Sequence, residues 1–184
     1  MRPFTIVAPV MGVTLPEVEL VIDACMKFYL GLSKKQRLES RIILLDNGKW
    51  SVFLREKLRE YRLGKFAQLV VVREKEGQES ALRRADLLFL PRLRKRARWV
   101  KIALSCGVPV LTYEGREGYA LLDHSCGRFV PVQSREKNVD AFSTLLLMLF
   151  FDPGAQKALK QSAERRRRTK PVSCEEDFIF TPAA

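Results

Sequence analysis

The sequence has few of the features that mark membrane, secreted or metal-binding proteins. Its longest apolar runs, such as 145–151, are far shorter than the roughly 20 residues that a membrane-spanning helix needs. No charged segment followed by an apolar one opens the chain, as it does in a signal peptide. From these absences we expect a soluble protein of the cytoplasm.

Histidine and cysteine are too sparse for a metal centre. The only histidine, His124, lies two residues before Cys126, whereas structural zinc takes four ligands. A histidine in a loop is the better interpretation, and a Ser-His-Asp mechanism has little support. The four cysteines are widely spaced, so we interpret them as reduced thiols. We expect neither a metal ion nor a cofactor.

Acidic residues are outnumbered: 33 lysines and arginines face 21 aspartates and glutamates, for a net charge of +12. This charge favours an anionic partner. The partner classes that fit are a phosphate-bearing small molecule, nucleic acid and an anionic membrane surface. Charge alone does not choose among them.

Short β-type runs alternate with amphipathic helical segments. The runs are continuously apolar, as in parallel strands that are buried on both faces. Such alternation is typical of βαβ units, so we predict a Rossmann-like three-layer αβα sandwich with a mainly parallel sheet of about six strands. The predicted strands are 4–8, 41–45, 67–72, 87–90, 108–112 and 128–130; the predicted helices begin near residues 16, 50, 77, 94, 119, 139 and 154.

The length suits one domain with a full hydrophobic core. We predict that this domain occupies residues 1–168. The segment 169–184, which contains two prolines and an acidic cluster, is predicted to be a C-terminal tail.

An ordered set of short motifs spans residues 85–164. Its pieces are ADLLFLP at 85–91, ALSCGVPV at 103–110, the segment 123–131 ending in FVP, and FDP at 151–153. This set resembles the C-terminal domain of retaining GT-B glycosyltransferases of group 1. The resemblance implies a nucleotide-sugar site at the loops after the strands, where helix N-termini favour phosphate.

The family's donor-site residues are missing from these positions. The family holds the diphosphate with an arginine and a lysine in the loop after the first strand, but loop 9–15 contains Gly12 and no basic residue. The family's paired glutamates align with Arg94 and Ile102. Because such groups stabilise the charges of the transition state, the usual catalysis is not expected and no catalytic residue is assigned. The family's active site also needs an N-terminal acceptor domain. Either that half is a separate region or a partner chain, or this domain works without it.

The candidate ligand site is a set of residues in the loops after the strands. The basic segment 92–98 follows the fourth strand, where its arginines could replace the lost phosphate clamp. The plainer alternative for the basic segment is a solvated helix face, and the alternative for the glycines is a role in turns only. The candidate phosphate- or nucleotide-binding residues are Gly12, Lys49, Arg92, Arg94, Lys95, Arg96, Glu114 and Gly115.

Three functions remain open at this point. The first is a glycosyltransferase half-domain that binds a nucleotide-sugar or another phosphate-bearing ligand and transfers hexose only with an N-terminal partner. The second is a degenerate, non-catalytic binding or scaffold domain of the same fold, which the missing glutamates favour. The third is nucleic-acid binding by the basic segment, although no recognition motif accompanies the charge.

Overall fold

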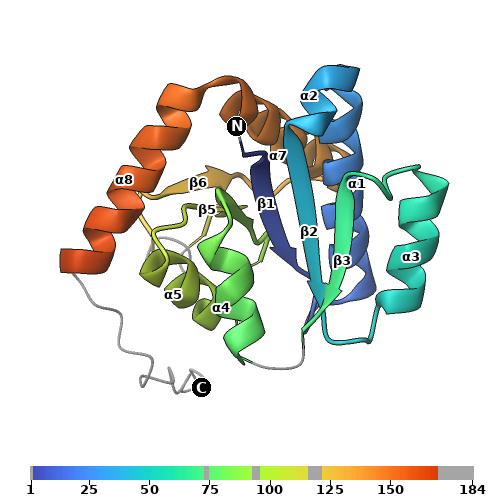
Figure 1. Cartoon of the computed structure of the whole chain (residues 1–184), viewed down its shortest axis with the longest axis horizontal. Helices are drawn as coiled ribbons and strands as arrows, with labels where there is room; N and C mark the ends of the chain where they lie inside the picture. The colour runs from blue at the N-terminus through green and yellow to red at the C-terminus, as the bar shows by residue number, and fades with distance from the viewer. Residues whose placement is uncertain (1, 73–74, 93–95, 116–121, 170–184) are drawn as a thin grey trace.

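A six-stranded sheet, in the order β3-β2-β1-β4-β5-β6, forms the centre of the molecule (Figure 1). This computed structural model describes residues 2–72, 75–92, 96–115 and 122–169. Each strand pairs in parallel with its neighbours, which confirms the predicted parallel sheet. The strands are β1 (Phe4–Pro9), β2 (Ser40–Asp46), β3 (Ala67–Val71), β4 (Leu87–Phe89), β5 (Val110–Tyr113) and β6 (Gly127–Val130).

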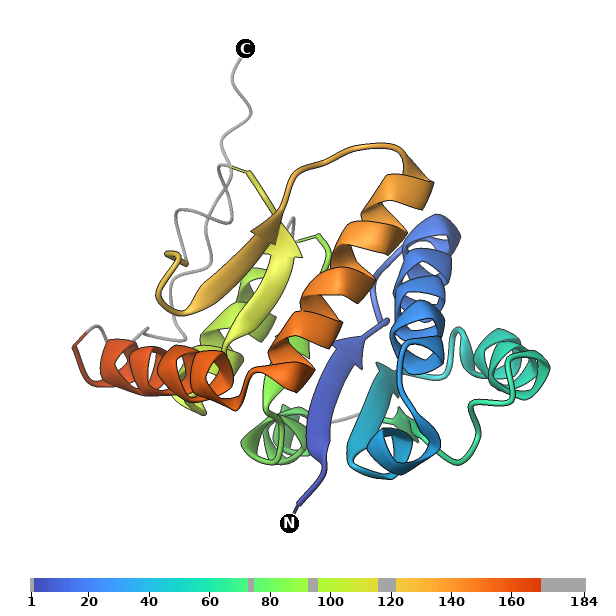
Figure 2. The same ribbon diagram turned by 90° about the horizontal axis from the view of Figure 1, so that it is seen from above.

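Helices cover both faces of the sheet and complete the predicted three layers. Successive residues of β1 point to opposite faces: Ile6 and Ala8 join the apolar cluster under α1, α3 and α7, and Val7 joins the cluster under α4 and α5. Figure 2 shows α1 and α7 side by side on one face. The helices are α1 (Leu15–Leu30), α2 (Lys34–Leu38), α3 (Ser51–Glu60), α4 (Lys75–Arg83), α5 (Ala97–Ser105), α7 (Arg135–Phe151) and α8 (Pro153–Thr169).

Local start signals explain where several helices begin. Thr14 and Glu17 form a capping box before α1, with a proline in its first turn, as predicted near residue 16. The short helix α2 was not predicted, although Ser33 and Gln36 form a second capping box there. Helix α5 begins at Ala97, not near Arg94 as predicted. The predicted helix at 119–122 and the tail from residue 170 fall largely outside the described residues.

The turn between α5 and β5 requires glycine. Gly107 has φ +71°, and a Cβ atom there would lie 2.5 Å from Cγ of Glu164 on α8. Both the left-handed backbone and this close approach exclude a larger residue without rearrangement. The turn therefore holds α8 against the end of α5. None of the described helices has the length and hydropathy that crossing a bilayer requires.

An aromatic cluster joins α7 to the centre of the sheet. The fully buried ring of Phe142 lies 5.0 Å from the ring of Phe89 on β4 and 4.9 Å from that of Tyr113 on β5, measured between centroids. Edge contacts of this kind add to the energy of burial. Phe142 thus packs α7 against β4 and β5.

We predict that Phe142→Ala lowers the free energy of unfolding by about 3–5 kcal/mol, because it removes a buried ring and leaves a cavity. Urea unfolding followed by circular dichroism measures this change. The matched control is Phe151→Ala on the same helix, where the ring is more than half exposed. The control should stay within about 0.5 kcal/mol of the parent. Similar losses in both variants would contradict this account of the core.

Candidate functional site

The order of the strands along the sheet changes direction between β1 and β4. The chain leaves β1 toward α1 on one face, and leaves β4 toward α5 on the other. In open α/β sheets, ligands bind at such a point, beyond the carboxyl ends of the strands. Residues 10–14, residues 90–92 and residue 96 lie at this point. They contain three of the predicted site residues, Gly12, Arg92 and Arg96.

Arg96 is the most unusual side chain at this point. It precedes α5 and is only 6% exposed. Its Nη2 donates a hydrogen bond of 2.5 Å to the carbonyl oxygen of Pro9 at the end of β1, and its buried Nε has no partner. Within the described residues, Arg96 takes part in no ion pair. Arg96 is therefore a buried cation that has no counter-ion in the part of the chain that the structure describes.

Burial disfavours the charged form of this guanidinium. Desolvation lowers the pKa of Arg96 to about 10, and the negative charge of Glu17 opposes this shift only in part. A decrease of this size corresponds to a destabilisation on the order of 3 kcal/mol while Arg96 is charged. An arginine held in this state is suited to an anion that enters from solvent.

Glu17 lies between the helix start and the loop after β4. Its Oε2 accepts hydrogen bonds from the backbone nitrogen of Thr14 at 2.7 Å and from the Thr14 hydroxyl at 2.9 Å. Its Oε1 lies 3.4 Å from Nε of Arg92, whose side chain is largely exposed. Glu17 was not among the predicted site residues, although the Thr14 to Glu17 spacing of the capping box marks it as a residue of the helix start.

The other predicted site residues also follow strands at this edge of the sheet. Gly12 lies in the loop after β1 with φ +72°, a conformation that suits glycine. Lys49 follows β2, and its Nζ lies 4.6 Å from the ring centre of Trp50. Glu114 follows β5, where its backbone nitrogen donates to the carbonyl oxygen of Val130 at 2.8 Å, and Gly115 is next to it. Arg94 and Lys95 lie outside the described residues.

No carboxylate occupies the place of the second family glutamate. That position is Ile102, which is 5% exposed and packs in the apolar cluster under α5. The side chain thus contributes to the core of the domain. The carboxylate of Glu17, which lies 3.4 Å from Arg92, comes from the first turn of α1 and not from the segment after β4.

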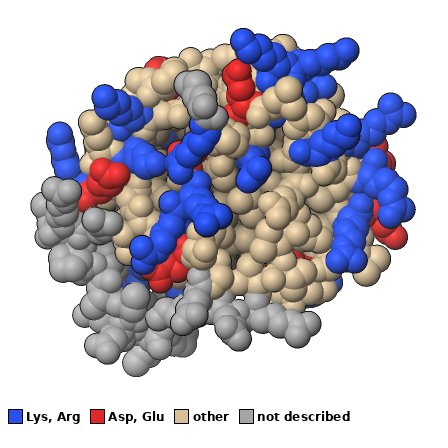
Figure 3. Space-filling view, in the orientation of Figure 1, with Lys and Arg blue, Asp and Glu red and all other residues tan. Residues whose placement is uncertain are grey.

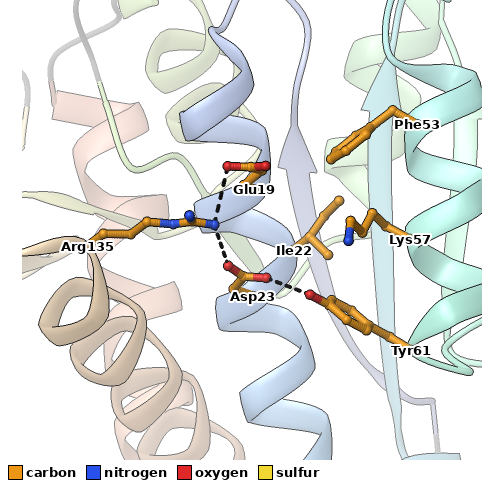
Figure 4. Close-up of a pocket in the computed structure, with 7 residues that line it drawn as sticks. All are labelled: Glu19, Ile22, Asp23, Phe53, Lys57, Tyr61 and Arg135. Carbon is orange, nitrogen blue, oxygen red and sulfur yellow. Dashed lines mark hydrogen bonds and ion pairs between the residues drawn. The ribbon is translucent and has the colours of Figure 1, made fainter.

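A separate pocket lies between α1, α3 and the start of α7 (Figure 4). Arg135 pairs with Glu19 and Asp23 inside the pocket, and Lys57 pairs with Glu60 beside it. Asp23 accepts from Nη2 of Arg135 at 2.7 Å and from the Tyr61 hydroxyl at 3.1 Å, and Glu19 lies 3.4 Å from Arg135. Since these charges are neutralised locally, we interpret the network as a link among three helices. In the described part of the chain, no group of metal-ligating side chains is arranged around a common point.

The fold resembles parts of several solved glycosyltransferase structures. The chain aligns with the pneumococcal O-GlcNAc transferase GtfA in complex with UDP and GlcNAc, with a TM-score of 0.71 at 13% identity, over 89% of this chain and 32% of that one. It aligns with WaaG, a glycosyltransferase involved in lipopolysaccharide biosynthesis, with a TM-score of 0.71 at 17% identity, over 92% of this chain and 44% of WaaG.

A third solved structure consists of a single domain and aligns with this chain over most of its length. It is the C-terminal domain of a group 1 glycosyltransferase, LpcC from Francisella tularensis, with a TM-score of 0.69 at 13% identity, over 93% of this chain and 88% of that one. The chain has the fold of a glycosyltransferase C-terminal domain. It spans about a third to less than half of the longer transferases. No family model matches the sequence, and no curated protein matches it either.

We predict that Arg96→Met raises the free energy of unfolding at neutral pH by about 1–2 kcal/mol, because removal of an unpaired buried charge outweighs the lost hydrogen bond to Pro9. The gain should shrink as pH rises from about 10, where the folded parent loses the charge. Urea unfolding in an anion-poor buffer measures both effects.

The control for this experiment is Arg98→Met, two residues further along the chain in the first turn of α5, where the side chain is exposed. Its stability should stay within about 0.5 kcal/mol of the parent. A loss of stability in Arg96→Met would mean that Arg96 is mainly a structural link between the two loops.

Proposed function

We propose that this chain is a glycosyltransferase-like domain that binds a nucleotide-sugar or another phosphate-bearing ligand at the carboxyl edge of its sheet. The observation that carries the proposal is the buried guanidinium of Arg96 between β1 and β4, which forms no ion pair with any described residue and whose Nε is unsatisfied there. A phosphate oxygen would supply both the missing charge and an acceptor for its N–H groups. Arginine suits this role because its planar fork matches phosphate geometry.

The surroundings of Arg96 favour the same class of ligand. The N-terminus of the 16-residue helix α1 opens beside it, and aligned backbone dipoles make a helix start favourable for negative charge. Exposed Arg92 adds a second cation on the solvent side of the proposed site. Arg94 and Lys95 are assigned to the same site from the sequence. Gly12, Lys49, Glu114 and Gly115 are proposed to line it from the loops after β1, β2 and β5.

The relatives in structure support a nucleotide-sugar in particular. The GtfA structure holds UDP and GlcNAc, and the LpcC domain belongs to a group 1 glycosyltransferase. At these low identities the support comes from the fold. We infer the GT-B arrangement from it, in which transfer requires a separate N-terminal acceptor domain on another region or a partner chain.

A non-catalytic binding or scaffold role is the second candidate function. It is favoured by the side chain of Ile102, which fills the core where the family's glutamate would reach the nucleotide. Arg96 would then retain an anion without any transfer. The proposed location in either case is the cytoplasm, in keeping with the thiols of Cys25 and Cys126.

We predict that calorimetry against a panel of nucleoside diphosphates and their sugar conjugates detects binding, and that Arg96→Met weakens it at least about tenfold, a loss of about 1.4 kcal/mol. The double variant Arg94→Ala with Lys95→Ala should weaken it as well. Arg98→Met is the matched control for removal of a nearby positive charge and should bind as the parent does.

Heat from no ligand in the panel would contradict the nucleotide proposal and leave the scaffold role. A salt-titrated mobility shift with random oligonucleotides tests nucleic acid in the same samples. If Arg96→Met leaves nucleic-acid binding unchanged, the basic surface binds a partner different from the ligand of the Arg96 site. The salt titration identifies such binding, because contacts to a nucleic-acid backbone depend strongly on salt.

We predict that Glu17→Gln tightens ligand binding by about three- to tenfold, because it removes a negative charge that competes with phosphate for Arg92 and Arg96. Glutamine can still form the capping box with Thr14, so the helix start should persist. Calorimetry with the tightest ligand of the panel measures the change. Weaker binding in this variant would mean that the carboxylate contacts the ligand directly.

A further inference from the structure

Large apolar side chains are exposed at the amino-terminal edge of the sheet, opposite to the candidate site. Leu30, Leu38, Met148 and Phe151 are between 53% and 76% exposed. They lie in the last turns of α1, α2 and α7, and α1 and α7 run back from the carboxyl edge to this end of the molecule (Figure 1). We refer to these four residues as the edge patch.

Direct contacts connect the helix ends that carry the edge patch. A Cβ atom on Gly31, next to Leu30, would lie 2.9 Å from Cδ1 of Leu147, next to Met148. Two further contacts connect α2 and the end of α7 to α1. The guanidinium of Arg37, beside Leu38, lies 4.1 Å from the ring centre of Tyr29, and Phe151 contacts Phe150, whose ring lies 6.0 Å from Phe28.

Exposed cations lie at the same end of the molecule as the edge patch. Figure 3 shows lysine and arginine side chains at the upper end of the molecule, where Figure 1 places α2. Two acidic residues near this end, Glu39 and Asp152, are exposed as well but are outnumbered. The exposed basic residues from α2 and from the chain segments that begin at this edge are Lys34, Lys35, Arg41, Lys65 and Lys157.

We propose that the edge patch docks this chain on an anionic lipid bilayer. Exposed leucine, methionine and phenylalanine would enter the boundary between headgroups and acyl chains, while the lysines at the same end contact lipid phosphates. A second copy of the chain fits this surface less well, because each copy carries a net charge of +12 and like charges repel. Docking at this edge leaves the Arg96 site on the side away from the bilayer.

The test is co-sedimentation of the full chain with vesicles of phosphatidylcholine alone or mixed with phosphatidylglycerol. We expect binding to the anionic vesicles only, and its decrease with added salt. Leu38→Asp with Phe151→Asp should reduce the bound fraction at least about tenfold, and Lys34→Glu with Lys35→Glu should also reduce it.

The matched control is Val52→Asp with Val71→Asp, which changes two exposed apolar residues at the carboxyl edge. Circular dichroism and thermal unfolding verify that each variant is folded. Retained binding in the control supports the proposal. Absence of vesicle binding, equal binding to neutral vesicles, or an equal loss in the control would overturn it. Self-association of the parent that disappears in Leu38→Asp with Phe151→Asp would instead assign the patch to a second copy.

Discussion

The hydrogen bond from Arg96 to the carbonyl oxygen of Pro9 joins the two loops on which the candidate site depends. It connects the end of β1 to the start of α5 across the point where the chain turns to opposite faces of the sheet. The same contact draws a positive charge out of water without giving it a negative partner among the described residues. Local structure and ligand preference therefore have one physical origin, the burial of this guanidinium.

The strands could be predicted well because their apolar runs are continuous and buried on both faces, as in β1 and β2. The start of α1 was equally clear, since Pro16 suits the first turn of a helix and apolar residues recur after it at spacings of three and four. The five-residue α2 was missed because so short a segment gives no periodic pattern. The start of α5 was placed too early because a run of arginines has good helix propensity, whereas the chain keeps Arg96 outside the helix to reach β1.

The candidate site could be located but not assembled from sequence. A loop after a parallel strand is expected to reach the ligand-binding edge, and this placed Arg92 and Arg96 there. That Glu17 faces them depends on β1 pairing with β4, which is a property of strand order and not of any local pattern. The difference between a solvated arginine and a buried one also lies beyond local sequence, because it is set by packing from distant segments.

If the proposed anion binds at Arg96, this buried cation would also connect the supply of ligand to the lifetime of the chain. A ligand that binds only the folded state lowers the population of open forms. An anion on Arg96 would in addition offset the desolvation that destabilises the folded state. When that anion is scarce, more molecules open transiently and reach proteases. The abundance of the protein would then follow the concentration of its ligand, with no dedicated regulator.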